Sequence, residues 1–124
     1  MPRYCFTLQV DPRHLDDYRR DHEAVWPEML RALADAGWHD YSLHLRDDGL
    51  LIGIVDTEDF QQALDAMETT EVNDRWQDAM APYFADLDGT APDRAVQLVP
   101  EIFHLETQLA AADTTPPAPE ENPR

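Results

Sequence analysis

The sequence predicts an α+β fold of the ferredoxin-like type, in which an antiparallel sheet carries its helices on one face. Three observations support this prediction: four strand-like segments, two helical regions between them, and their β-α-β-β-α-β order along the chain. The chain has 124 residues, which suits a single domain with a modest core. We expect that domain to comprise residues 1–105.

The first three strands are predicted from hydrophobic patterning. Arg3–Val10 alternates between apolar and polar residues, as a half-buried strand does. Trp38–Arg46 alternates in the same way and carries Tyr41 on its apolar face. The sequence DDG at residues 47–49 then predicts a hairpin. Leu50–Asp56 is almost continuously apolar, which indicates a central strand that is covered on both faces.

Two helical regions separate these strands. The first is expected over residues 12–36, broken or bent near Pro27, because proline disfavours helix in the residue before it and removes a backbone donor. Gly37 is typical of a helix C-terminus. The second region is predicted to contain two helices, Glu58–Glu68 and Glu71–Tyr83, each with an apolar stripe.

The end of the chain divides into a strand and a tail. Val96–Leu105 is predicted to be the fourth strand, and Pro100 within it indicates a sheet edge or a bulge. Residues 106–124 form an acidic, proline-rich tail that we expect to be disordered. Helices on one face leave the apolar strand Leu50–Asp56 uncovered on the other. We therefore predict a homodimer packed sheet to sheet.

Composition excludes several classes of function. The formal net charge of −17 argues against nucleic-acid partners and against anionic membrane surfaces. All nine basic residues are arginine, which excludes a Schiff-base lysine. Cys5 is the only cysteine, so no intrachain disulfide can form.

No apolar run approaches the roughly 20 residues that span a bilayer, and the start of the chain lacks a signal-like segment. We expect a cytoplasmic protein. No histidine or carboxylate spacing typical of metal ligands occurs, so no metal site is expected.

One segment combines a histidine with aromatic residues at helical spacing. Tyr18, His22 and Trp26 each follow the previous one by four residues, or about 400° of helix, and so would share one side of it. Tyr18 and His22 occupy positions where a helix normally directs leucine at the core. This favours a polar pocket within an apolar wall. The alternative is that both are ordinary core residues, with the histidine hydrogen-bonded.

Other elements direct aromatic residues into the same layer. Tyr41 lies on the helix-facing side of its strand, and Trp76 lies on the apolar stripe of the last helix. Aromatic faces with a few hydroxyl and imidazole groups suit a sugar, whose C–H face stacks while its hydroxyls form directed hydrogen bonds. A histidine that titrates near neutral pH can transfer protons. The alternative, that these aromatics only fill the core, stays open at this point.

The sequence resembles the L-rhamnose mutarotase family. The similar stretches occur in the family's order and cover about the first 105 residues: RYCFTLQV, YRRDHEAVWPE, GWHDYSLHL, RWQDAMAPYF and PEIFHLE. The resemblance implies a dimeric ferredoxin-like fold, that is, a dimeric α/β barrel. It also implies an isomerase that interconverts the α and β anomers of L-rhamnose, or of a related monosaccharide, without a cofactor.

The same resemblance assigns roles to individual residues. His22 becomes the proton donor, and the substrate-binding residues become Tyr18, Tyr41, Trp76 and Gln77. The family often has a second tryptophan where this chain has Gln77. That difference leaves one substrate contact, and with it the preferred sugar, undetermined.

The chemistry of mutarotation suits such a site. The sugar ring opens when its ring oxygen gains a proton and its anomeric hydroxyl loses one, and it then recloses on the other face of the carbonyl. Acid–base catalysis contributes about 10²–10⁴-fold, which is enough for a reaction that is already easy. The second proton-transfer group is left open between Tyr18, Glu101 and water.

Two other functions fit the same fold. A cofactor-free monooxygenase would need a larger pocket and an electron-rich polycyclic substrate. A non-catalytic module that binds small ligands would keep Trp76 and Tyr41 important but would not need His22.

Overall fold

The structure is a computed structural model that describes residues 1–114. Its four strands form one antiparallel sheet in the order β2-β3-β1-β4: β1 (Arg3–Gln9), β2 (His39–Leu45), β3 (Leu50–Asp56) and β4 (Gln97–Val99). This is the strand order of the ferredoxin-like plan, and the α+β prediction is confirmed.

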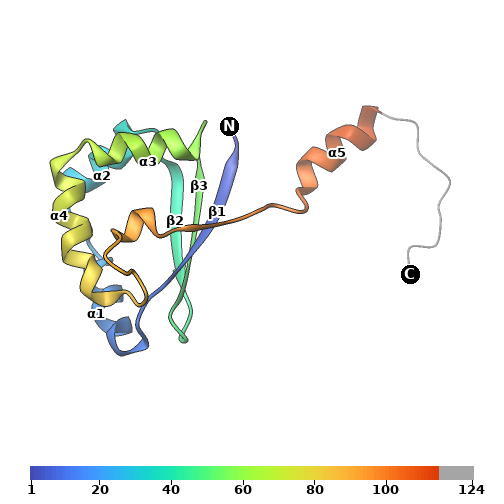
Figure 1. Cartoon of the computed structure of the whole chain (residues 1–124). Coiled ribbons are helices and arrows are strands. Elements are labelled where there is room, and N and C mark those ends of the chain that lie inside the picture. Colours follow the sequence, from blue (N-terminus) through green and yellow to red (C-terminus); the bar gives the residue numbers. More distant parts are fainter. Residues whose placement is uncertain (115–124) are drawn as a thin grey trace.

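Four α-helices lie on one face of this sheet: α1 (Leu15–Asp21), α2 (Pro27–Asp35), α3 (Phe60–Glu68) and α4 (Glu71–Met80) (Figure 1). Three short 3-10 helices accompany them: η1 (Pro12–His14), η2 (Ala81–Tyr83) and η3 (Pro92–Arg94). Thr70 starts α4 because its hydroxyl accepts a hydrogen bond of 3.3 Å from the Asn73 N–H, which satisfies a donor that the first helical turn leaves unpaired.

The core fills the layer between these helices and the sheet. Phe6, Leu51 and Val55 point into it from β1 and β3, and each is almost fully buried. The ring of Phe6 lies over Gly53, where an added Cβ would come within 2.2 Å of the ring carbon Cζ. Gly53 therefore leaves room for the Phe6 ring, although a glycine inside a strand makes that strand less stable.

The opposite face of the sheet is not covered within the chain. Along β3 the side chains alternate, with Leu51 and Val55 buried under the helices while Ile52 and Ile54 are only half-buried on the other face. Both faces of β3 are apolar, but the chain itself covers only the face under the helices.

The first helical region differs from the prediction in its break. α1 ends at Asp21 and α2 begins at Pro27, so residues 22–26 are not helical. The prediction that Tyr18, His22 and Trp26 share one continuous helical face is therefore wrong. Pro27 occupies the first helical position, where its missing N–H leaves no hydrogen bond unmade, and it thus starts a helix rather than bending one.

The C-terminal part also differs from the prediction. The fourth strand has only three residues, because Pro100 follows Val99 and has no N–H to continue the ladder. Residues 106–114, the first part of the predicted tail, belong to α5 (Leu105–Thr114) in the structure. Residues 115–124, the rest of the predicted disordered tail, lie outside the described residues. Figure 1 shows the segment after β4 running away from the domain on the side of the sheet opposite the helices.

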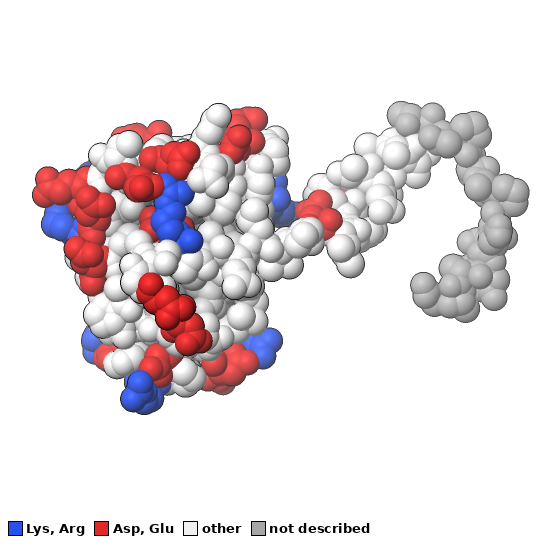
Figure 2. All heavy atoms as spheres, in the orientation of Figure 1, with Lys and Arg blue, Asp and Glu red and all other residues white. Residues whose placement is uncertain are grey.

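On the face drawn in Figure 2, acidic side chains lie in several groups, with arginines beside some of them. Arg19 contacts Asp47 at 3.0 Å and Arg75 contacts Glu28 at 2.9 Å, and all four side chains are largely exposed. Such pairs contribute little to stability, about 0–1 kcal/mol each. None of the helices in residues 1–114 has the length and apolar character that crossing a membrane requires.

Candidate functional site

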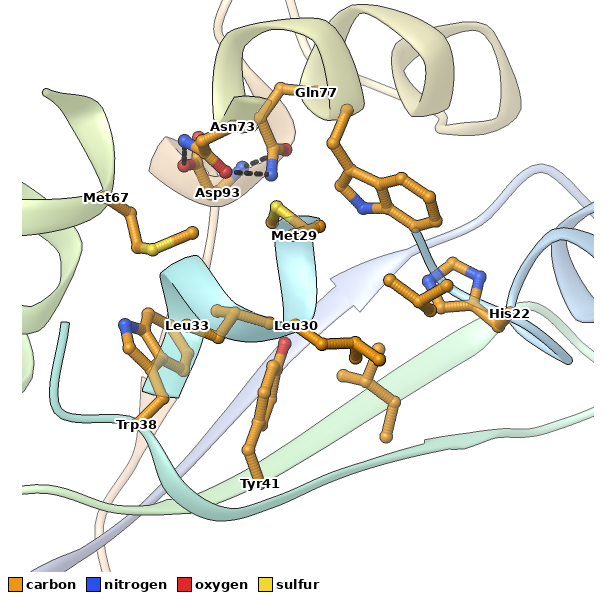
Figure 3. Close-up of a pocket in the computed structure, with 13 residues that line it drawn as sticks. His22, Met29, Leu30, Leu33, Trp38, Tyr41, Met67, Asn73, Gln77 and Asp93 are labelled. Atoms are coloured by element: carbon orange, nitrogen blue, oxygen red, sulfur yellow. Dashed lines mark hydrogen bonds between the residues drawn. The ribbon is translucent and has the colours of Figure 1, made fainter. Parts of the chain in front are cut away.

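A cavity of about 330 Å³ lies among α2, α4 and β2. Its walls are mostly apolar, and a few polar or aromatic side chains face it: His22, Trp38, Tyr41, Asn73, Trp76, Gln77 and Asp93 (Figure 3). A smaller cavity of about 70 Å³ shares several of these residues and extends toward the sheet under Phe6 and Leu51.

His22 is held by the end of α1. The helix ends at Asp21, and the imidazole Nδ1 lies 2.8 Å from the main-chain carbonyl oxygen of Tyr18. A carbonyl oxygen can only accept, so Nδ1 carries the hydrogen and Nε2 keeps its lone pair. The His22 ring lies 4.2 Å from the Tyr18 ring and meets the Trp76 ring edge-on at 5.3 Å. Contact on both sides fixes the orientation of the imidazole.

The environment of His22 favours its neutral form. Burial lowers the pKa of His22 below its usual 6.5, and the hydrogen bond to Tyr18 and the charge of Asp21 oppose this only in part. At pH 7 the imidazole is therefore a base with Nε2 available, rather than an acid.

Tyr18 lies behind His22 rather than in the wall of the larger cavity. Its side chain is buried and lines the smaller cavity. Burial, with a smaller effect from Tyr41, raises the pKa of Tyr18 far above its usual range. The hydroxyl therefore stays protonated and can donate a hydrogen bond, but it is a poor base.

Tyr41 reaches the cavity from the sheet. Its ring packs against Trp38 at 4.8 Å, and its hydroxyl points into the cavity (Figure 3). Burial raises the pKa of Tyr41 strongly, and the nearby negative charge of Asp93 adds to this effect. Tyr41 is thus a neutral donor and acceptor on the strand side of the cavity.

Trp76 and Gln77 come from adjacent positions of α4. Trp76 is 7% exposed and lies between His22 and Trp26, whose ring it meets edge-on at 5.0 Å. Trp26, at the start of α2, thus contacts a residue of the cavity wall but lines neither cavity itself. Gln77 lines the cavity and uses both ends of its amide in hydrogen bonds to the protein.

These bonds belong to a polar cluster of Asn73, Gln77 and Asp93 (Figure 3), of which the sequence predicted only Gln77 as a site residue. Gln77 Nε2 donates to Asn73 Oδ1 at 3.0 Å, Asn73 Nδ2 donates to Asp93 Oδ2 at 2.9 Å, and the Asp93 N–H donates to Gln77 Oε1 at 3.2 Å. The four-residue spacing of Asn73 and Gln77 is a signal for a helical side-chain pair. No comparable signal marks Asp93, which lies in η3.

Four of the five predicted site residues line the larger cavity: His22, Tyr41, Trp76 and Gln77. Tyr18 lines the adjoining smaller one. Glu101, an option for the second proton-transfer group, is exposed and lies instead beside Arg3 and His104 at another part of the surface. Among residues 1–114, no group of three or more histidine, cysteine or acidic side chains is placed to hold a metal ion.

Comparison with known proteins gives consistent results. The sequence profile described as L-rhamnose mutarotase matches residues 3–105. A protein named L-rhamnose mutarotase from Jannaschia sp. (strain CCS1) is 38% identical over 109 residues, which cover 85% of this chain and 99% of the relative. One of the same name from Acidiphilium cryptum (strain JF-5) is 37% identical over 108 residues, with coverage of 85% and 99%. The crystal structure of an L-rhamnose mutarotase from Formosa agariphila matches the fold with a TM-score of 0.67 at 20% identity, covering 84% of this chain and 98% of that one.

Proposed function

The chain belongs to the L-rhamnose mutarotase family, and from this premise we propose that its cavity binds L-rhamnose or a closely related sugar and interconverts the α and β anomers. The enzyme is then an isomerase. The observation that carries the proposal is the imidazole of His22, whose Nδ1 lies 2.8 Å from the Tyr18 carbonyl oxygen, at an apolar cavity with few polar groups.

His22 acts first as a base in this mechanism. Its Nε2 takes the proton of the anomeric hydroxyl while the bond between the anomeric carbon and the ring oxygen breaks. The imidazolium then gives this proton to the ring oxygen, which becomes a hydroxyl of the open-chain aldehyde. Rotation about the bond next to the aldehyde presents its other face, and the reverse steps close the ring as the other anomer. His22 is thus the proton donor in the second half of the same catalytic cycle.

One imidazole can serve both oxygens because both are bonded to the same anomeric carbon. The hydrogen bond from Nδ1–H to the Tyr18 carbonyl holds the ring in place and stabilises the imidazolium that forms between the two transfers. Tyr18 itself, with its strongly raised pKa, contributes a hydrogen bond rather than a base. Water is the remaining option for a relay between the two oxygens.

The cavity walls suit the substrate. Val25, Met29 and Leu30 on the side of α2 offer an apolar surface for the C–H groups and the methyl group of a 6-deoxy sugar, and Trp76 offers an aromatic face. A volume of about 330 Å³ lies at the small end of the range of ligand sites, roughly 300–1,000 Å³. It fits a monosaccharide better than the polycyclic substrate that a cofactor-free monooxygenase would need.

Exchange spectroscopy tests the proposal directly. Saturation-transfer NMR measures the rate at which the two anomers of a sugar interconvert, with and without the protein. We expect faster exchange for L-rhamnose, and smaller or no acceleration for sugars whose C5 substituent or ring hydroxyls differ. An unchanged exchange rate for every sugar, with a correctly folded protein, would refute the enzymatic proposal and favour a binding module.

We further propose that the enzyme is a homodimer in which two sheets pack face to face. The half-buried Ile52 and Ile54 on the open face of the sheet support this proposal. The segment after β4 adds to it, because Ile102 is 96% exposed and Phe103 is 59% exposed within a single chain. A second copy would cover both the sheet and this segment, and so complete a dimeric α/β barrel.

The remaining proposals concern location and other partners. The net charge of −17 disfavours nucleic acids and anionic membranes as partners. The family is one of sugar-metabolising enzymes, and we propose that the protein acts in the cytoplasm.

A further inference from the structure

Asp93 presents a carboxylate to the cavity that the mechanism above does not use. Its side chain is half-buried and lines both the larger and the smaller cavity. Asn73 donates a hydrogen bond of 2.9 Å to Oδ2, and Gln77 accepts one of 3.2 Å from the Asp93 N–H. The second carboxylate oxygen, Oδ1, accepts no hydrogen bond from another residue within the described part of the chain.

The charge of this carboxylate is not balanced by a cation. No ion pair joins Asp93 to an arginine or histidine within residues 1–114, and the adjacent Arg94 instead contacts Asp65 and Glu68. Burial raises the pKa of Asp93, so the fold carries a free-energy cost for keeping the charge there. An asparagine at position 93 could accept the same hydrogen bond from Asn73, and so hold η3 against α4, without burying a charge.

We propose that Asp93 is a substrate-binding residue whose free oxygen accepts a hydrogen bond from one particular hydroxyl of the sugar. The inference rests on the proposed function, since it assigns a role in the same cavity. The sugar is then held between Asp93 on the side of α4 and Tyr41, whose hydroxyl points into the cavity from β2, while His22 lies at a third position on the wall (Figure 3). Three polar groups on an apolar surface fix the orientation of a polyhydroxylated ring.

Gln77 holds the polar cluster in place. Its amide donates to Asn73 Oδ1 and accepts from the Asp93 N–H, and so it fixes both the partner of the carboxylate and the main chain of Asp93. An aromatic side chain at this position could make neither hydrogen bond. Gln77 and Asn73 therefore position the carboxylate of Asp93, and in this proposal the site selects sugars that carry a hydroxyl at this point and disfavours deoxy analogues.

The test pairs protein variants with sugar analogues. Affinity is measured by NMR titration for L-rhamnose and for its 2-deoxy, 3-deoxy and 4-deoxy derivatives, with wild type, Asp93→Ala and Asp93→Asn. With wild type, one of the three derivatives should bind about 10- to 100-fold more weakly than L-rhamnose, the effect of a lost hydrogen bond to a charged group. With Asp93→Ala, L-rhamnose and that derivative should bind alike, because the partner of the missing hydroxyl is gone.

Kinetics and a matched control complete the test. Asp93→Asn, which keeps the shape and removes the charge, should raise KM by about tenfold and leave kcat within a few-fold. Asp78→Asn removes the same charge from an exposed position on α4 and should change neither constant.

Each remaining outcome has a defined meaning. Equal loss of affinity for all four sugars in the Asp93 variants, or a lower melting temperature with unchanged KM, would overturn the inference and leave Asp93 as a residue that only docks η3. If wild type exchanges the anomers of L-rhamnose but discriminates against none of the derivatives, the inference fails and the proposed function stands. If wild type neither exchanges nor binds any of these sugars, both fail.

Discussion

The Nδ1–H of His22 donates a hydrogen bond of 2.8 Å to the carbonyl oxygen of Tyr18, four residues earlier in the chain. A main-chain group of α1 thus fixes the tautomer of the imidazole. The bond uses the backbone of Tyr18 and not its hydroxyl, so the two contributions of Tyr18 can be separated by mutation.

His22→Gln should remove most of the catalysed anomer exchange. Glutamine keeps polarity and much of the volume but cannot gain and lose a proton near pH 7, so the acceleration should fall by about 10²–10⁴-fold. Saturation-transfer NMR measures the rate, and thermal denaturation shows whether the variant is folded. A folded variant with the wild-type rate would contradict the catalytic assignment and leave Tyr18 or water as the next candidate.

The pH dependence should follow the lowered pKa of His22. The neutral form is the active base, so the exchange rate should hold at neutral pH and fall only below the folded-state pKa, which is less than 6.5. Stability should change in the same direction: between the two pKa values the unfolded chain binds the proton and the folded chain does not, so stability falls as pH decreases from about 6.5.

The comparison that isolates this effect is wild type against His22→Gln. The difference in free energy of unfolding between them should shift in favour of the variant as pH falls below about 6.5. Titration of all other groups is shared by both proteins. A difference that stays constant from pH 8 to pH 5 would show that the pKa of His22 is not lowered.

Tyr18→Phe should have a modest effect. The variant keeps the carbonyl oxygen that holds His22 and the ring that packs against it at 4.2 Å, and it loses only the hydroxyl. We expect binding or rate to change by an amount equal to one neutral hydrogen bond, about 0.5–1.5 kcal/mol. A loss as large as that of His22→Gln would instead make Tyr18 a proton-transfer group.

Trp76→Ala should affect stability as well as binding. The side chain is 7% exposed and contacts both His22 and Trp26, so its truncation leaves a core cavity that costs about 3–5 kcal/mol. Trp76→Phe keeps an aromatic face and is the variant in which sugar affinity can be compared. Chemical denaturation and NMR titration give the two quantities. Full stability of Trp76→Ala would show that the ring is not part of the core.

The wild-type protein should be a dimer at micromolar concentration, with a mass by light scattering of twice 14.2 kDa. Ile102→Asp should weaken that dimer without unfolding the chain, because Ile102 is 96% exposed in a single copy and makes no core contact there. Glu106→Gln is the control, since it changes an exposed polar residue of α5, in the same segment after β4 as Ile102. A wild-type protein that is a folded monomer would refute the dimer.

The pattern of the sequence was sufficient for the parts of the fold that depend on neighbours along the chain. Leu50–Asp56 is a strand with the predicted bounds, and Glu71 starts a helix after Thr70 as expected. Alternation places Tyr41 on the helix-facing side of β2, and helical periodicity places Trp76 in the core. Strand and helix periods are local properties, so the residues themselves contain this information.

The same reasoning failed where local signals compete. Periodicity continued past His22, but α1 ends at Asp21 and the chain needs residues 22–26 to reach the start of α2. The alanine-rich stretch with Leu105 and Leu109 forms α5. The prediction grouped this stretch with the proline-rich residues that follow it, because it judged residues 106–124 by their composition as a whole. Propensity within a short window is a weak guide when the next segment has a different character.

Only the tertiary structure identified Asp93 and its relation to the site. The hydrogen bonds that hold it join residues 16 and 20 positions apart, from α4 to η3, and no pattern along the chain marks such a pair. The choice of tautomer at His22 likewise depends on where a carbonyl oxygen lies in space. The sequence alone thus determined the family, the strand order and four of the cavity residues. Which ring nitrogen of His22 carries the hydrogen, and which carboxylate lines the cavity, follow from distances between atoms that only the folded chain brings together.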